Sequence, residues 1–296
     1  MPRGAGFDKT NGMQRRCVPA IWFSRARLAA FLLGCLAAAT SLTAELFPDP
    51  NLESAVRRQV FAKRESTEPL LEADVVNVST VDARNRGVTN LAGLEKCRSL
   101  AMLDLGGNRV ADLSPLIGLT RLQYLDVQSN RVSDLQPLTG ATSLQYLQLA
   151  HNQVRGVEAL SGLTNLSALY LSGNRVEEVA PLLGLRRLAS LYLDDNRLLK
   201  VDGISALRGL SSLSLGGNRI DDLKPLAGLD SLQHLFLERN RVQDLAPLVE
   251  WAQGDKEQRF APFLRVYLDG NPLGSTARKS QLEALKAAGV RVQRMP

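Results

Sequence analysis

Leucine and asparagine recur along most of the chain with one fixed period. An asparagine returns every 22 residues and closes a phrase of the form L-x-x-L-x-L-x-x-N, as in Leu122–Asn130 (LQYLDVQSN). When each repeat is numbered from its first leucine, further apolar residues fall at positions 11, 14, 17 and 20. Positions 4 and 6 share one face of a short strand, and the later three-residue spacing turns the other apolar groups inward. The seven asparagines are Asn108, Asn130, Asn152, Asn174, Asn196, Asn218 and Asn240.

One such unit cannot bury its apolar residues alone, but stacked units form a continuous core with parallel strands about 4.8 Å apart. The asparagine at position 9 leaves the strand, where its amide can pair backbone groups that a turn leaves open. We therefore interpret the asparagines as structural and assign them no ligand. Proline at position 16, as in Pro115 and Pro137, predicts an extended return segment without ladder hydrogen bonds.

The full pattern, LxxLxLxxNxVxDLxPLxGL, resembles the 22-residue class of leucine-rich repeat found in bacterial internalins and in the leucine-rich regulatory subunit of protein phosphatase 1. The resemblance covers the chain from about Phe47 to the C-terminus. It implies an α/β fold: a leucine-rich repeat solenoid, or curved horseshoe, with a parallel sheet on the concave face, a helical N-terminal cap and a helix–strand C-terminal cap. It leaves the partner open, because such scaffolds host unrelated partners.

The repeat register divides the chain into four predicted segments. In the N-terminal cap, Asp49 is expected to cap a helix over Phe47–Phe61 with Pro50 in its first position, and a second short helix follows Thr67. The ninth repeat starts at Phe263, 31 residues after the eighth, because of an insertion. The segments are a signal peptide (1–44), a helical cap (45–77), nine repeats (78–273, insertion near 250–262) and a C-terminal cap (274–296).

The first 44 residues have the pattern of an export signal. Arg25 and Arg27 precede an apolar run of about 15 residues, which is too short to span a bilayer comfortably, and small residues at 43–44 offer a cleavage site. We expect a secreted or periplasmic protein that starts near Glu45, translated from Met1 or from Met13. The alternative is a membrane-attached lipoprotein, because residues 32–35 (LLGC), which end at Cys35, resemble a lipobox. We expect attachment to a membrane only if Cys35 is lipidated or the signal is not cleaved.

Charge and cysteine content narrow the function further. The formal net charge is +6, but residues 1–44 carry +5 of it, so the body of the chain is nearly neutral and gives no case for nucleic acid. Removal of the signal leaves one cysteine, Cys97, at an apolar repeat position, where we expect a buried thiol and no disulfide. Arginines fill position 10 of six repeats, and we expect them to be neutralised by acids three residues later.

Positions 3 and 5 of each strand point away from the core, onto the concave face. All five tyrosines of the protein fall in these two columns, which core packing does not require. Exposed aromatic rings with a polar tip favour contact with a partner, whereas the alternative is that aromatics simply suit strands. The predicted partner-binding residues are Tyr124, Tyr146, Tyr170, Tyr192, His234, Phe236 and Tyr267, bordered by the acids Asp126 and Asp194.

Catalytic and cofactor motifs are missing from the sequence. His151 and His234 lie four repeats apart with no cysteine or carboxylate cluster at metal-ligand spacing, and the adjacent pair Asp194-Asp195 reads as a solvated rim. We predict a non-enzymatic, monomeric binding scaffold without cofactor or metal, which recognises a protein, with a glycan as the other option. Two alternatives are a regulatory subunit of an enzyme such as a phosphatase, against which the export signal argues, and a hydrolase on the acidic face.

Overall fold

A computed structural model describes residues 45–293 of the chain. The predicted signal peptide, with Cys17 and Cys35, lies outside these residues. Within the described part, no helix is both long enough and apolar enough to cross a bilayer.

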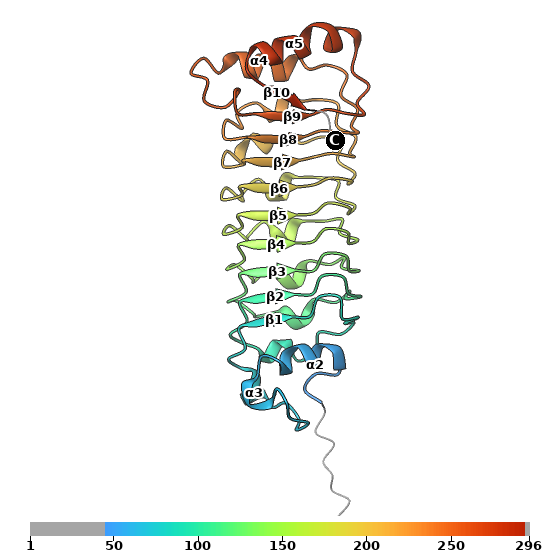
Figure 1. The fold of residues 1–296 in the computed structure, drawn as a ribbon, viewed down its shortest axis with the longest axis vertical. Coiled ribbons are helices and arrows are strands. Elements are labelled where there is room, and N and C mark those ends of the chain that lie inside the picture. Colours follow the sequence, from blue (N-terminus) through green and yellow to red (C-terminus); the bar gives the residue numbers. More distant parts are fainter. Residues whose placement is uncertain (1–44, 294–296) are drawn as a thin grey trace, which may run out of the picture. The chain divides into compact units, whose positions relative to one another are not determined.

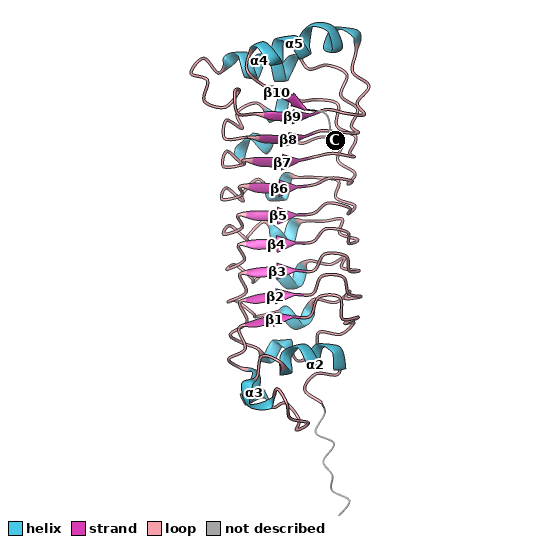
Figure 2. Ribbon diagram, viewed as in Figure 1, coloured by secondary structure: helices cyan, strands magenta, loops and turns pink. Residues whose placement is uncertain are grey.

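Ten parallel strands form one sheet in which each strand pairs with the next in sequence order (Figure 2). The register matches repeat positions directly, so that Tyr124 faces Tyr146 and Leu125 faces Leu147 across neighbouring strands. Nine strands lie in the nine predicted repeats and the tenth follows the C-terminal helix. Their bounds are β1 Thr80–Asp82, β2 Met102–Asp104, β3 Tyr124–Asp126, β4 Tyr146–Gln148, β5 Ala168–Tyr170, β6 Ser190–Tyr192, β7 Ser212–Ser214, β8 His234–Phe236, β9 Arg265–Tyr267 and β10 Arg291–Gln293.

The core runs without interruption through the stack, as the apolar spacing predicts. In the fourth repeat, Leu144, Leu147 and Leu149 at positions 1, 4 and 6 are fully buried, and the same holds in the repeats on either side. Cys97 is also fully buried, and burial raises the pKa of its thiol to about 12, so this thiol is an inert core group.

The asparagines form the predicted structural ladder. Asn174, which is 7% exposed, donates from Nδ2 to the carbonyl oxygens of Leu149 and Leu171, both at 2.9 Å. Its Oδ1 accepts from the backbone N–H of Val154 at 3.0 Å. One side chain thus pairs backbone groups of two neighbouring repeats, and the other six asparagines of the series make the same three bonds, with Asn108 bonding to Val88 of the first repeat.

The return segments are short 3₁₀ turns, so the extended form predicted from proline at position 16 is wrong. Pro115 lies inside the turn Ser114–Leu116, and Pro137 inside Gln136–Leu138. Proline suits the start of a turn as well as an extended chain, because its fixed φ is near the 3₁₀ value and the first turn needs no N–H. The other turns are Leu94–Lys96, Glu158–Leu160, Ala180–Leu182, Ile204–Ala206 and Lys224–Leu226.

Helices α2 (Pro50–Arg57) and α3 (Glu72–Val75) lie at the β1 end of the stack (Figure 1). The predicted cap of α2 is confirmed: Asp49 Oδ1 accepts from the N–H of Asn51 at 3.0 Å and of Leu52 at 3.2 Å. Its Oδ2 accepts from the N–H of Thr89 at 2.7 Å, so one carboxylate joins the helix to the first repeat. Both helices are shorter than predicted.

Helix α4 (Ala246–Gly254) covers the start of the predicted insertion, which continues as a loop. Helix α4 lies with α5 (Leu282–Ala287) at the β10 end (Figure 1). Trp251 is partly buried and stacks on Phe260 at 4.5 Å between ring centroids. The expectation that Phe263 opens the ninth repeat inside the core is wrong, since Phe263 is 62% exposed and Leu264 is buried. The N–H of Leu264 donates to Phe260 O at 3.0 Å in the turn before β9, and Leu264 takes the buried position in place of Phe263.

Candidate binding face

The outward positions of the strands carry one connected row of aromatic rings. Across β3 and β4, Tyr124 and Tyr146 stack with their ring centroids 4.4 Å apart and their planes at 7°. Tyr146 crosses from position 3 to Tyr170 at position 5 with 5.3 Å between centroids, and Tyr170 stacks on Tyr192 at 5.0 Å. We call the row Tyr124, Tyr146, Tyr170, Tyr192, Phe236 and Tyr267 the aromatic ladder; His234 lies beside Phe236 at 6.3 Å.

The ladder rings support one another and are not free surface groups. Each of the six is half-buried, and burial raises the pKa of Tyr124 and Tyr170 and raises that of Tyr146 to about 12. These three phenols stay protonated at neutral pH, so the O–H of each can donate and accept a hydrogen bond. The face thus offers ring edges and neutral hydroxyls, the mixed apolar and polar chemistry that suits protein interfaces.

At the β1 end, the acids of the face are neutralised within the chain. Arg84 donates from Nε to Asp104 Oδ2 at 2.9 Å and from Nη2 to Asp126 Oδ2 at 2.5 Å. Asp126 is only 2% exposed, and burial outweighs its bonds and raises the pKa of its carboxyl group. Asp126, one of the predicted contact residues, therefore stabilises the face from within and offers a partner almost no surface.

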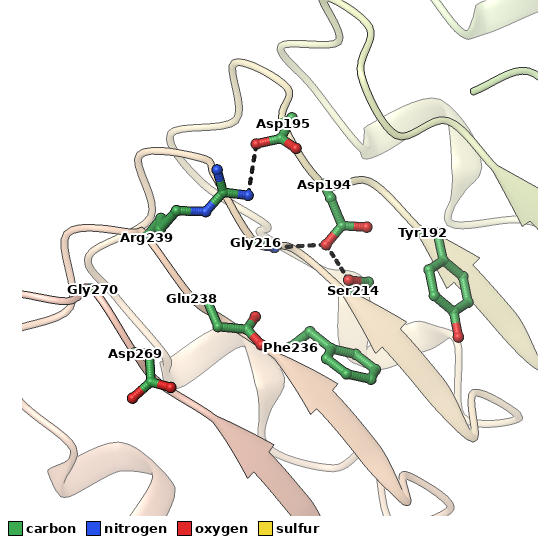
Figure 3. Close-up of a pocket in the computed structure, with 10 residues that line it drawn as sticks. All are labelled: Tyr192, Asp194, Asp195, Ser214, Gly216, Phe236, Glu238, Arg239, Asp269 and Gly270. Carbon is green, nitrogen blue, oxygen red and sulfur yellow. Dashed lines mark hydrogen bonds and ion pairs between the residues drawn. The ribbon is translucent and has the colours of Figure 1, made fainter. Parts of the chain in front are cut away.

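At the other end, the face is hollowed between β6 and β9 (Figure 3). The hollow has a volume of about 600 Å³ and arises because the seventh repeat carries small residues, Ser214 and Gly216, where its neighbours carry large ones. Strands two apart are separated by about 9.6 Å, yet the rings of Tyr192 and Phe236 are only 6.5 Å apart, so they lean together over Ser214. The aromatic ladder skips the seventh repeat here, and Tyr192 and Phe236 remain neighbours across it.

Carboxylates line the bottom of the hollow. Asp194, a predicted contact residue, is well paired: its Oδ1 accepts from Ser214 Oγ and from the N–H of Gly216 at 3.1 Å, and its Oδ2 from Ser172 Oγ at 2.9 Å. Glu238 is 8% exposed, and its Oε1 is buried without a hydrogen-bond partner. Burial is the main cause that raises the pKa of Glu238.

The sequence-based prediction named the acid Asp194 but missed the hollow and the burial of Glu238. The signal was present as the stretch SLSLGG at 212–217, where serine or glycine occupies every outward position of the repeat. A run of small outward residues with large residues on both sides forms a depression in the face.

The remaining polar side chains do not assemble into a metal site. Within residues 45–293, no group of three or more histidine, cysteine, aspartate or glutamate side chains could hold a metal ion. His151 occupies a turn with φ 57°, whereas His234 lies beside Phe236 of the aromatic ladder, so the two histidines belong to different parts of the fold.

The position-10 arginines are exposed or half-exposed, and their expected neutralisation by acids three residues later is wrong. In the described part of the chain, none of these acids lies within ion-pair distance of its arginine; the one bridge made by this column joins Arg197 to Glu177 at 3.6 Å. The aspartates at these positions instead accept hydrogen bonds at the start of the segment that follows: Asp112 Oδ1 accepts from Ser114 N–H at 2.8 Å, and Asp134 Oδ1 from Gln136 N–H at 2.9 Å. Aspartate commonly accepts from the N–H two residues on, and this local bond wins over a distant guanidinium.

Comparison with known proteins gives matches to repeat families and to solved structures. The family model described as leucine rich repeat matches residues 120–176 and 186–242, and that of two-copy leucine rich repeats matches residues 98–140. No curated protein matches the chain.

Among solved structures, internalin C2 of Listeria monocytogenes is 33% identical, with a TM-score of 0.66 over 69% of this chain and 89% of that one. Internalin F of the same organism is 22% identical, with a TM-score of 0.53 over 87% and 94% of the two chains, and shows the fold alone. So does the ectodomain of a receptor kinase of Arabidopsis thaliana, at 24% identity and a TM-score of 0.55 over 60% of this chain and 23% of that one. With its 22-residue repeat, asparagine ladder and likeness to internalin C2, the chain belongs to the leucine-rich repeat proteins of the internalin-like class.

Proposed function

We propose that the protein is an exported, non-enzymatic scaffold that binds a protein partner along the aromatic ladder. Leucine-rich repeat proteins are typically binding scaffolds without enzymatic activity, and the fold is consistent with that role. The observation that carries the proposal is the row of six contacting rings on strand positions that the core does not use.

The ladder has the properties of an interface centre. Tyrosine and other large rings account for much of the binding energy in protein interfaces, above all in central, well-packed positions. Because the rings already hold one another, little side-chain entropy remains to be lost when a partner covers them. The matched Arabidopsis thaliana ectodomain is in complex with CASPARIAN STRIP INTEGRITY FACTOR 2, which supports a binding role for a protein of this fold.

Export is the second part of the proposal. Its support is the pattern of basic residues followed by a short apolar run before residue 45. N-terminal sequencing of the protein recovered outside the cytoplasm should give a start near Glu45. Recovery of an intact Met1 or Met13 on protein in the cytoplasm would contradict export, and a lipid on Cys35 would place the protein at a membrane.

Capture of the partner tests the face. The protein is used as bait, and captured proteins are identified by mass spectrometry and then titrated. The triple variant Tyr146→Ala, Tyr170→Ala, Tyr192→Ala should bind the captured protein at least about tenfold more weakly, a loss of about 1.4 kcal/mol. The same three tyrosines changed to Phe keep the stacked rings and test the hydroxyls separately.

The matched control is the triple variant Arg109→Ala, Arg131→Ala, Arg175→Ala, which alters three surface side chains away from the ladder. It should change affinity far less. Circular dichroism must show that the alanine variant of the ladder still folds, since its leucine core is intact. If the folded ladder variant binds as the unchanged protein does, the face is not the binding site.

A further inference from the structure

The hollow between β6 and β9 contains a buried carboxylate oxygen with nothing to bond to. Glu238 is 8% exposed, its Oε1 has no hydrogen-bond partner, and the residue lines the hollow (Figure 3). Leaving a buried carboxylate oxygen unpaired costs free energy of folding. A substitution of Glu238 by an apolar residue would remove that cost if no ligand paired with the oxygen. An unmet acceptor at the bottom of a surface hollow points to a ligand that donates hydrogen bonds.

The charge of the lining favours a cationic ligand. Four acids, Asp194, Asp195, Glu238 and Asp269, line the hollow, and Arg239 is the one basic side chain among the described residues that do so. Arg239 is mostly exposed and is held by Asp195 at 3.0 Å. A negative field inside a hollow with apolar walls is focused rather than dispersed, and therefore attracts positive charge.

The shape of the hollow favours a flat organic cation over a metal ion. A Cβ atom on Gly216 would lie 3.1 Å from Asp194 Oδ1 and 3.3 Å from Glu238 Oε2, so the absent side chain leaves open space against both carboxylates. Tyr192 and Phe236 line the same hollow, with 6.5 Å between their ring centroids. Aromatic faces attract organic cations, whereas they supply no ligand to calcium or magnesium, and no metal-binding group occurs in the described part of the chain.

A second buried acid on this face, Asp126, is already paired with a cation within the chain. Asp126 at the other end is buried as Glu238 is, and its carboxylate receives a guanidinium from Arg84. A guanidinium is planar, stacks on rings, loses little hydration and donates two parallel bonds to carboxylates, which a lysine ammonium does not. Glu238 lacks such an internal partner.

We propose that the hollow binds an arginine side chain of the protein partner, with Glu238 and Asp194 accepting from its guanidinium and the rings of Tyr192 and Phe236 beside it. The source of the arginine rests on the proposed function. The guanidinium site itself is tested without any partner.

The probe is N-acetyl-arginine amide, and the control ligand is N-acetyl-citrulline amide, which has nearly the same shape without the charge. Backbone amide shifts of the isotope-labelled protein are followed by NMR during each titration. The arginine probe should saturate shifts at Gly216 and Gly217, and the citrulline probe should not. Glu238→Gln should weaken the arginine probe at least tenfold, whereas Glu177→Gln, the same change at an exposed acid outside the hollow, should leave it unchanged.

Equal binding of the citrulline probe, or unchanged binding to a folded Glu238→Gln protein, would overturn the inference. So would a lysine probe that binds as tightly as arginine, or calcium shifting the same amides in a manner that requires Glu238. The comparison of arginine with citrulline uses the unchanged protein, so it decides even if Glu238→Gln fails to fold. If the probe fails while the ladder variants still lose the partner, the inference falls alone; if the probe binds and the ladder variants keep the partner, the proposed function falls.

Discussion

Replacing Asn174 by Ala tests whether the asparagine ladder stabilises the stack of repeats. The change removes three buried bonds, from Asn174 Nδ2 to Leu149 O and Leu171 O and from Val154 N–H to Asn174 Oδ1. Each group left unpaired costs about 1–3 kcal/mol, and at 7% exposure water reaches the site poorly. We expect a loss of about 3 kcal/mol, the sum of three groups at the lower end of that range.

Urea denaturation followed by circular dichroism measures the loss as a change in the unfolding midpoint at constant slope. Two variants sharpen the test. Asn174→Asp keeps the acceptor for Val154 but places a charge beside two carbonyl oxygens, so it should cost more than alanine. Asn271→Ala removes the same kind of bonds at a partly buried site near the end of the array, where water can replace them, and should cost less. An Asn174→Ala protein within about 0.5 kcal/mol of the parent would refute the ladder argument.

Three other changes probe single contacts. Asp49→Ala should cost about 1–2 kcal/mol of unfolding free energy at pH 7, because it removes a helix cap. Burial alone would raise the pKa of Asp49, but hydrogen bonds from Thr89, Asn90 and Leu52 outweigh it and lower that pKa. The difference from the parent in urea denaturation should therefore shrink as the pH falls below about 4. Glu238→Gln should raise the melting temperature at pH 7: burial raises the pKa of Glu238, so its charged form destabilises the fold as the pH rises through that pKa, and the variant should lose this slope. Tyr146→Ala removes ring contacts at 4.4 and 5.3 Å and should cost about 1–3 kcal/mol in thermal unfolding, whereas Tyr146→Phe should cost little.

The strands, the core and the asparagine ladder could be predicted because successive repeats have leucine and asparagine at the same positions. A leucine at position 4 faces the same neighbours in each unit, as Leu125 and Leu147 do, so an error in one repeat is corrected by the next. The first strand shows this, since its position 9 holds Arg86 in place of asparagine and the register still places β1 correctly.

Local conformation was harder to predict, because one residue type suits more than one backbone state. Proline fits both the expected extended return and the observed 3₁₀ turn. Position 8 adopts positive φ in every repeat, with Gly107 at 71° but also Ser129 at 54° and His151 at 57°, and only the glycines signal this in the sequence. Phe263 failed as a core residue because the insertion before it breaks the period.

For the candidate binding face, the sequence predicts which residues point outward but not how deeply each one lies. Alternation along a strand shows that a ring points outward; it does not show that the ring leans on its neighbour, as Tyr146 does on Tyr124. Depth depends on what three consecutive repeats place side by side, and the hollow exists because Ser214 has a small side chain and Gly216 has none. Whether an acid there is paired depends on long-range geometry, as the contrast between Asp126 and Glu238 shows.

Because Gly216 contributes no side chain to the hollow, a substitution there can fill it from within the chain. Arg84 holds position 7 of its repeat and pairs with carboxylates of the next two repeats, and Gly216 holds the same position in the seventh repeat. Its φ is not positive, so Gly216→Arg introduces no backbone strain, although the new Cβ must displace the Asp194 and Glu238 carboxylates by a few tenths of an ångström.

The new guanidinium should reach Glu238, raise the melting temperature, and abolish shifts by the arginine probe. Gly216→Met adds similar bulk without charge, and it should block the probe without the gain in stability. A Gly216→Arg protein that melts lower than Gly216→Met would show that the Glu238 carboxylate does not need a guanidinium partner, and the arginine assignment would lose its electrostatic basis.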